Sequence, residues 1–289
     1  MIRALFGVMW LLRLLPPRAL AAIGGALGVL AYRLVAERRR VTRINLAQCF
    51  PWMAAAERER LARAHFGAWC RSFLDHALLW WAPRSRIEQL VRVEGLEHLR
   101  ALGGAPAILL VPHFVGLDAG FTRLSGEVDM VSMYAQQKNR RLAARLLAGR
   151  MRFGRQKLVS RQDGIRAVLG TMRDGRPLYY LPDMDYGPRG ALFVPFFGVS
   201  AATMPGLSRI ARVTGAKVLP CVTRMLPGGA GYLVSIEEPW RNFPTEDAAA
   251  DTLRMNQYIE RKVLEAPEQY FWMHKRFKTR PEGEARFYA

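Results

Sequence analysis

The sequence predicts an α/β fold in which one mixed sheet is flanked by helices. After Pro83, short apolar runs alternate with longer segments of helical periodicity, which is typical of strands joined by helices. The chain has 289 residues, of which 51% are hydrophobic, so it can bury one large core. Six runs are expected to form strands: residues 90–93, 107–111, 130–133, 177–181, 217–222 and 232–236.

The N-terminal segment is expected to lie at a membrane. Residues 1–36 contain no acidic side chain, and Pro16-Pro17 separates two apolar blocks, 4–15 and 19–31. Because about 20 apolar residues are needed to cross a bilayer, each block suits a broken hairpin or an interfacial helix better than a complete span. A cleaved signal peptide is the alternative. The cluster Arg38-Arg39-Arg40 indicates the cytoplasmic side.

We therefore expect residues 1–36 to anchor the chain and residues 37–289 to form the working domain. The formal net charge is +19, from 43 basic and 24 acidic residues, which favours a polyanionic partner: nucleic acid, an anionic membrane surface or a phosphorylated substrate. The three cysteines have no metal-ligand spacing, so buried free thiols are expected and a zinc site is not.

The clearest predicted helix covers residues 54–81. Its apolar side chains recur at spacings of three and four, which gives a broad face for packing on the sheet. His65 and His76 lie inside this helix without neighbouring histidine, cysteine or acidic ligands at metal-binding spacing. Both are interpreted as structural residues.

A histidine with a nearby carboxylate follows one of the expected strands. His113 comes directly after the run 107–111 and Pro112, and Asp118 lies five positions further on. Ligands bind at the carboxyl ends of strands in open α/β sheets. On one continuous helix the two side chains would point about 140° apart. We therefore expect a bend at Gly116, with Asp118 in the first helical turn, orienting His113 as a general base. A capping or surface pair is the alternative.

A second polar strand end follows the run 177–181. Asp183, Asp185 and Arg189 leave this strand through a glycine turn, which topology places near the first strand end. An ordinary Asp and Gly turn explains the same residues. The aromatic segment 193–198 is expected either to line an acyl-chain groove or to belong to the core.

The C-terminal run carries four cations, Lys275, Arg276, Lys278 and Arg280. Such a run is usually a solvated basic face, but beside an anchored N-terminus it suits phosphate binding. The glycine-rich segment 227–231 is expected to close a hairpin between the last two strands. Residues 198–202 do not form a nucleophile elbow, so a hydroxyl nucleophile is expected to come from the substrate, with no cofactor.

Several motifs occur together along the chain: Asn45-Leu46 with Cys49-Phe50-Pro51, His113 with Asp118, Gly149-Arg150, residues 181–189, residues 193–198 with Ala202-Thr203, Leu219-Pro220, and the run from Pro267 to Pro281. In combination they resemble the bacterial lipid A late acyltransferases, the lauroyl and myristoyl transferases, over nearly the whole length. The resemblance implies a glycerolipid-acyltransferase-like fold with an N-terminal membrane-associated helical segment.

The resemblance also implies a reaction. A fatty acyl group would move from acyl carrier protein to a hydroxyl of a Kdo-bearing lipid A precursor at the cytoplasmic face of the inner membrane. His113 would deprotonate that hydroxyl, with Asp118 as its orienter. Arg150 and Asp183 resemble positions that the family needs, Arg150 for anionic groups and Asp183 for positioning.

Two departures from the family pattern concern the substrate. Many members carry glutamate where this chain has Asp118 and asparagine where it has Pro112, and the spacing around Arg150 needs a small shift. Acylation of another glycolipid or a glycerophospholipid is therefore the alternative reaction. A non-catalytic membrane-tethered binder of nucleic acid or anionic lipid is a second alternative. The stacking and basic motifs of nucleic-acid modules are missing, so nucleic acid is not an expected partner.

Overall fold

The computed structural model describes residues 2–135 and 139–289. Within this part of the chain, the α-helices are α1 (Ile2–Leu12), α2 (Pro17–Leu34), α3 (Ala36–Cys49), α4 (Ala55–Trp81), α5 (Arg84–Leu90), α6 (Leu96–Arg100), α7 (Leu117–Leu124), α8 (Arg140–Arg150), α9 (Gly164–Arg173), α10 (Gly206–Thr214) and α11 (Ala248–Glu265). The strands are β1 (Val91–Glu94), β2 (Ala107–Leu110), β3 (Val131–Tyr134), β4 (Lys157–Ser160), β5 (Leu178–Tyr180), β6 (Leu192–Phe196), β7 (Val199–Thr203), β8 (Lys217–Met225) and β9 (Tyr232–Ile236). Three short 3-10 helices complete the set: η1 (Arg161–Asp163), η2 (Pro227–Gly229) and η3 (Pro267–Gln269).

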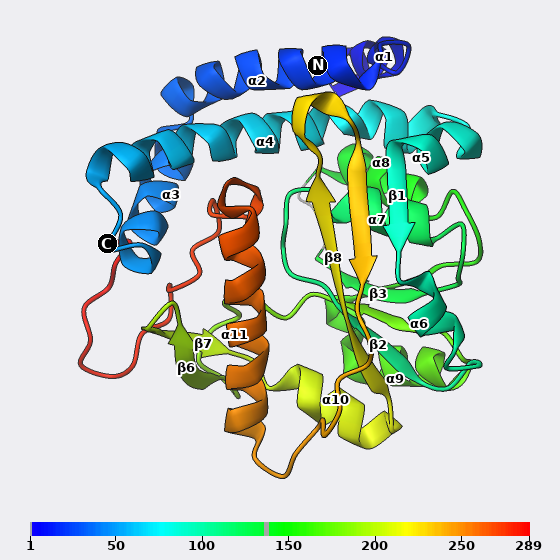
Figure 1. Cartoon of the computed structure of the whole chain (residues 1–289), viewed down its shortest axis with the longest axis vertical. Helices are drawn as coiled ribbons and strands as arrows, with labels where there is room; N and C mark the ends of the chain where they lie inside the picture. The colour runs from blue at the N-terminus through cyan, green and yellow to red at the C-terminus, as the bar shows by residue number, and fades with distance from the viewer. Residues whose placement is uncertain (1, 136–138) are drawn as a thin grey trace.

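Seven strands form one mixed sheet in the order β1-β9-β8-β2-β5-β3-β4, and β6 and β7 form a separate hairpin. All neighbouring pairs of the large sheet are parallel except β8 and β9. The β8 arrow points toward α4 (Figure 1). Because β2 and β5 run parallel to β8, their carboxyl ends face the same edge of the sheet.

The central strand β2 is covered on both faces, as the unbroken apolar run predicts. Ile108 and Leu110 enter one hydrophobic cluster, and Leu109 and Val111 enter the other. Helices α9, α10 and α11 contribute to the first cluster, and α5, α6 and α7 to the second. Helix α4 contributes to both, because it runs across the end of the sheet (Figure 1).

The six predicted strands are confirmed as β1, β2, β3, β5, β8 and β9, and the predicted hairpin after residue 225 is formed by η2. The helix expected over residues 54–81 is confirmed as α4. Strand β4 and the hairpin of β6 and β7 were not among the elements expected from the sequence. The three cysteines are buried and free, as expected.

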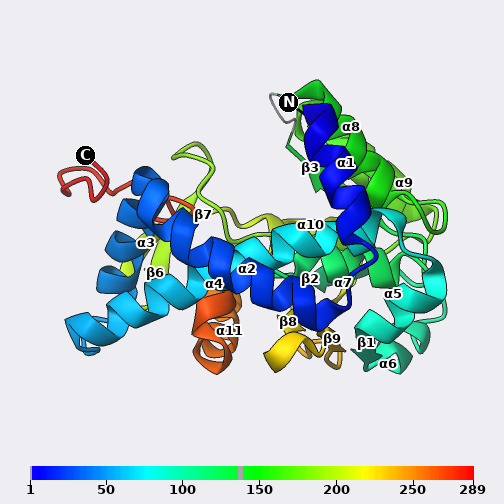
Figure 2. The ribbon, with the colours of Figure 1, turned by 90° about the horizontal axis from the view of Figure 1, so that it is seen from above.

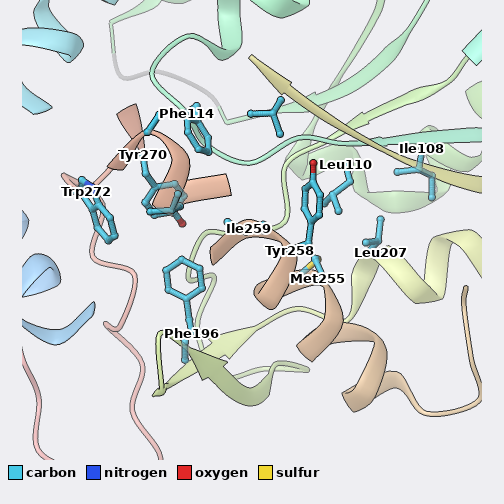
Figure 3. Packing of buried hydrophobic residues seen from close by; sticks show 14 of the residues in the cluster. Ile108, Leu110, Phe114, Phe196, Leu207, Met255, Tyr258, Ile259, Tyr270 and Trp272 are labelled. Carbon is cyan, nitrogen blue, oxygen red and sulfur yellow. The ribbon is translucent and has the colours of Figure 1, made fainter. Parts of the chain in front are cut away.

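The aromatic segment before Gly198 divides between core and surface. Phe196 is fully buried with Tyr270 and Phe277, whereas Phe193 on the same strand is 41% exposed. Figure 3 shows Phe196 beside α11, below Tyr270 and Phe114. The core interpretation therefore holds for Phe196.

Among the described residues, the segment 2–35, which includes α1 and α2, carries more than half of the exposed large apolar side chains, Trp10, Leu14, Val29 and Leu34 among them. Seen from above, α2 lies along α4 and α1 turns off at its end (Figure 2). Among the described residues no single helix has the length and apolarity needed to cross a membrane. Helices α2 and α3 reach them only as a pair bent by 94°.

Two glycines let α2 approach α4 closely. A Cβ on Gly28 would lie 2.5 Å from the Gly67 Cα, and a Cβ on Gly24 would lie 2.6 Å from the Arg71 Cα. Gly25, on the same helix, has open space around the corresponding position. The contact between these helices therefore depends on Gly24 and Gly28.

Replacing Gly28 with alanine is expected to destabilise the protein by about 1–3 kcal/mol, because the new methyl group must push the α2 and α4 backbones apart. Gly25→Ala is the matched control, and its gain in helix propensity should leave stability unchanged or raise it by up to about 1 kcal/mol. Thermal unfolding of both variants in one buffer measures the difference. Equal melting temperatures would show that the close approach is not needed.

Candidate active site

His113 and Asp183 meet at the carboxyl ends of two adjacent parallel strands. Leu110 of β2 is in register with Tyr180 of β5, and each of the two functional residues lies three positions beyond its strand. The His113 Nδ1 lies 2.6 Å from the Asp183 Oδ1, and the His113 backbone N–H donates to Oδ2 at 2.9 Å. Asp183 therefore fixes both the ring and the backbone of His113.

This contact sets the tautomer of His113. A buried carboxylate accepts, so Nδ1 carries the proton and Nε2 keeps its lone pair. Burial alone would raise the pKa of Asp183, but the positive charge that His113 carries once it is protonated, together with its hydrogen bonds, holds the pKa of Asp183 below its usual value. The His113 side chain is 17% exposed and that of Asp183 is 0% exposed. The arrangement is that of a general base with a buried orienter.

The segment after η3 forms a third wall of the site. The Phe271 N–H donates to the His113 carbonyl at 2.9 Å, and the Val115 N–H donates to the Gln269 carbonyl at 2.8 Å. The rings of Phe114 and Tyr270 pack edge to face (Figure 3). These contacts hold the His113 loop against the C-terminal segment.

The predicted pairing of Asp118 with His113 is wrong. Asp118 does lie in the first turn of α7, after Gly116 as expected, but its carboxylate contacts other side chains. The Arg150 Nε donates to Oδ1 at 2.7 Å, and the His76 Nε2 lies 3.3 Å from Oδ2. The bend directs Asp118 toward α4 and α8, which leaves Asp183 to orient His113.

His76 has a partner at each ring nitrogen. Its Nδ1 lies 2.9 Å from the Ser72 carbonyl, which can only accept, and its Nε2 faces the Asp118 carboxylate. Both nitrogens donate only when the ring is an imidazolium. Burial opposes that charge, but Asp118 outweighs it and the pKa of His76 is raised. From the sequence, His76 was expected to be an isolated structural residue, and its contact with Asp118 was not predicted.

The raised pKa of His76 predicts a pH-dependent stability. A raised folded-state pKa adds stability that is complete below the unfolded value of about 6.5 and is lost as pH rises through the folded value. His76→Gln should therefore cost about 2 kcal/mol at pH 5.5 and progressively less above pH 6.5. Thermal unfolding between pH 5.5 and 9 tests this. A cost independent of pH would exclude the imidazolium.

The expected phosphate-binding residues occupy different environments. Lys278 and Arg189 are exposed, and the side chain of Arg150 is 27% exposed with its Nε on Asp118. Lys275 forms an ion pair with Glu37 at 2.8 Å. Asp183, expected to position substrate, is buried against His113.

Two of the four cations in the C-terminal run, Arg276 and Arg280, do not belong to a solvated basic face. Arg276 is 2% exposed and donates to the Ala202 carbonyl and the Thr203 hydroxyl. Arg280 donates to the Ser200 carbonyl. Both side chains tie the run to the hairpin of β6 and β7 by donating hydrogen bonds to oxygens of β7.

A cavity of about 610 Å³ opens between α2, α4 and η2, with Arg18, Gly25, Gly67 and Gln269 among its lining residues. Its lining does not include His113, Asp118 or Asp183. The cavity is therefore separate from the strand-end site, although Gln269, which lines it, accepts a hydrogen bond from Val115 beside that site.

His113 lies at a strand end with a buried orienter, and its Nε2 has no hydrogen-bond partner among residues 2–135 and 139–289, which defines a site for deprotonating a substrate group. The sequence profile described as bacterial lipid A biosynthesis acyltransferase matches residues 2–279. The chain belongs to this family and is an acyltransferase.

Curated relatives cover nearly the whole chain. The chain is 35% identical to the lipid A biosynthesis lauroyltransferase of Escherichia coli (strain K12), over 96% of its own length and 91% of the relative's. It is 32% identical to the palmitoleoyltransferase of that organism, over 98% and 92% of the two lengths. It is 32% identical to the myristoyltransferase, over 95% and 86%. The resemblance drawn from the sequence is confirmed.

Proposed function

We propose that this protein transfers a fatty acyl chain from acyl carrier protein to a hydroxyl of a Kdo-bearing lipid A precursor at the cytoplasmic face of the inner membrane. The observation that carries the proposal is the 2.6 Å contact between His113 and Asp183, which leaves Nε2 ready to accept a proton. The relatives are all lipid A biosynthesis acyltransferases, which supports a lipid A precursor as the acceptor.

In the proposed reaction the acceptor hydroxyl attacks the thioester carbonyl of the donor. The His113 Nε2 takes the hydroxyl proton, and Asp183 stabilises the imidazolium through Nδ1. The same imidazolium then protonates the leaving thiolate. No covalent enzyme intermediate is needed, because the substrate supplies the nucleophile.

Charge and surface support the partners in this proposal. The net charge of +19 complements both an acidic carrier protein and the phosphates of the acceptor. Of the three guanidinium nitrogens of Arg150, only Nε has a hydrogen-bond partner among the described residues. The two terminal nitrogens therefore remain for an anionic group. Arg189 and Lys278, which are both exposed, are the other proposed anion-binding residues.

The apolar surface of α1, α2 and the turn between them supports a position at the bilayer. Trp10, Leu14, Val29 and Leu34 are each more than a third exposed, and apolar side chains of this size gain free energy when they enter the membrane interface. We propose that residues 1–36 anchor the enzyme there, so that the acyl chains of donor and acceptor need not cross water.

The test is acyl transfer by purified protein from acyl carrier protein thioester to lipid A precursor, followed by mass spectrometry. The wild type should add one acyl mass to the acceptor. His113→Ala should lose at least about 1,000-fold in kcat while unfolding at the wild-type temperature. Unchanged turnover in that variant would overturn the role of His113. Product from a glycerophospholipid but not from the lipid A precursor would overturn the acceptor.

A further inference from the structure

His274 lies beside the catalytic pair, on the segment that forms the third wall of the site. The Asn45 side chain donates to the His274 carbonyl at 2.7 Å, and the His274 N–H donates to the Phe271 carbonyl at 3.3 Å. Phe271 in turn donates to the His113 carbonyl. The backbone that carries His274 is therefore anchored both to α3 and to the His113 loop.

The ring of His274 is held as one tautomer. The Asp185 backbone N–H donates to the His274 Nε2 at 3.0 Å, so Nε2 keeps its lone pair and the ring proton lies on Nδ1. Asp185 is itself fixed, because its carboxylate accepts from the Thr279 N–H and hydroxyl and from the Gly187 N–H. The His274 Nε2 therefore accepts its hydrogen bond from a turn that is itself held in place.

The same ring stays neutral at physiological pH. Burial, together with the smaller effects of the nearby charges of His113 and Arg276, lowers the pKa of His274 to about 4, although Asp183 and Asp185 act in the opposite direction. At pH 7 the ring therefore presents a neutral, fixed N–H. Among the described residues, no hydrogen-bond partner of Nδ1 is formed.

We propose that His274 is a second catalytic residue, which donates its Nδ1–H to the carbonyl oxygen of the acyl donor as that oxygen becomes negative. A neutral imidazole N–H suits this role, because it stabilises developing charge without giving up its proton. His113 supplies the base, and His274 supplies the hydrogen-bond donor for the oxyanion. The two segments that carry them are joined by the hydrogen bond from the Phe271 N–H to the His113 carbonyl. This inference rests on the proposed acyl transfer.

The step is balanced in atoms and charge. The acceptor oxygen forms a bond to the thioester carbon while its proton passes to the His113 Nε2, and the carbonyl π electrons move to the oxygen that faces His274. When the carbonyl re-forms, the bond from carbon to sulfur breaks. The proton on His113 then goes to the leaving sulfur, and His274 retains its own proton throughout.

Two amide substitutions separate the roles of the ring nitrogens. In His274→Asn the side-chain NH₂ replaces the Nδ1 donor but cannot reach the Asp185 N–H. In His274→Gln the side-chain oxygen replaces the Nε2 acceptor but leaves no donor at the Nδ1 position. With an acyl carrier protein donor, we expect kcat to fall about 100-fold or more in His274→Gln and to stay within about tenfold of wild type in His274→Asn, with KM nearly unchanged in both.

A purely structural role predicts the opposite order, since only the glutamine variant keeps the bond to Asp185. Equal losses in both variants, or a change confined to KM, would also overturn the proposal. A wild type that makes no acylated lipid A would instead overturn the proposed function. If the glutamine variant does not fold, ¹⁵N NMR of wild-type protein labelled at its five histidines decides: a proton on Nε2 of His274 at pH 7 excludes the donor.

Discussion

Replacing Asp183 with asparagine is expected to lower kcat by about three to four orders of magnitude while leaving the fold intact. The asparagine oxygen can still accept the His113 backbone N–H, which Asp183 accepts at 2.9 Å. Its NH₂ group would then face Nδ1, where the carboxylate lies 2.6 Å away in the native protein. The ring would carry its proton on Nε2 and could no longer act as a base.

The expected change can be seen apart from activity. Imidazole ¹⁵N shifts should place the His113 proton on Nδ1 in the wild type and on Nε2 in Asp183→Asn. Asp174→Asn is the matched control, because it removes the same charge from a carboxylate that is 66% exposed and pairs with Arg176. Wild-type kcat in Asp183→Asn would exclude Asp183 as the orienter of His113.

The sequence was sufficient to place His113 but not to choose its partner. An unbroken apolar run followed by histidine marks a strand end, and the strand, the bend and the helix that starts at Leu117 all form as expected. The choice between Asp118 and Asp183 depends on which strands are neighbours. β2 and β5 are adjacent although two strands and three α-helices separate them in the chain. One signal was present in the sequence: His113 and Asp183 each come directly after a proline, Pro112 or Pro182, that ends a short apolar run.

The roles of His76 and Arg276 were hidden for a similar reason. His76 looks isolated in the sequence because its partner, Asp118, lies 42 positions away. Arg276 resembles a surface cation within a basic run, but it faces a hairpin that the sequence reading did not predict, with acceptors at Ala202 and Thr203. Local patterns specify elements, while the use of a charged side chain depends on what packs against it.

Replacing Arg150 with methionine is expected to destabilise the protein by about 3 kcal/mol, because it leaves the Asp118 carboxylate with His76 alone. The two side chains are 27% and 20% exposed, so solvent reduces the cost below that of a fully buried pair. Burial would raise the pKa of Asp118, but the charges of Arg150 and His76 hold it far below its usual value. The methionine variant loses the charge that lowers the pKa of Asp118 most.

A double-mutant cycle isolates this pair from the loss of packing. Asp118→Asn removes the charge that needs Arg150, so the double variant Asp118→Asn with Arg150→Met should be more stable than the sum of the single effects predicts, by at least about 1 kcal/mol. Strictly additive effects in chemical denaturation would show that Arg150 and Asp118 are not coupled.

The pH dependence gives an independent check on the same pair. A depressed folded-state pKa adds stability above the unfolded value of about 3.9, and that stability is lost as pH falls toward the folded value. The wild type should therefore lose more stability than Arg150→Met between pH 5 and pH 2.5. An equal loss in both would mean that Arg150 does not set the pKa of Asp118. Asp118 lies on α7, His76 on α4 and Arg150 at the end of α8. A coupled result would therefore show that the contacts of Asp118 with Arg150 and His76 hold these three helices together beside the catalytic strand end.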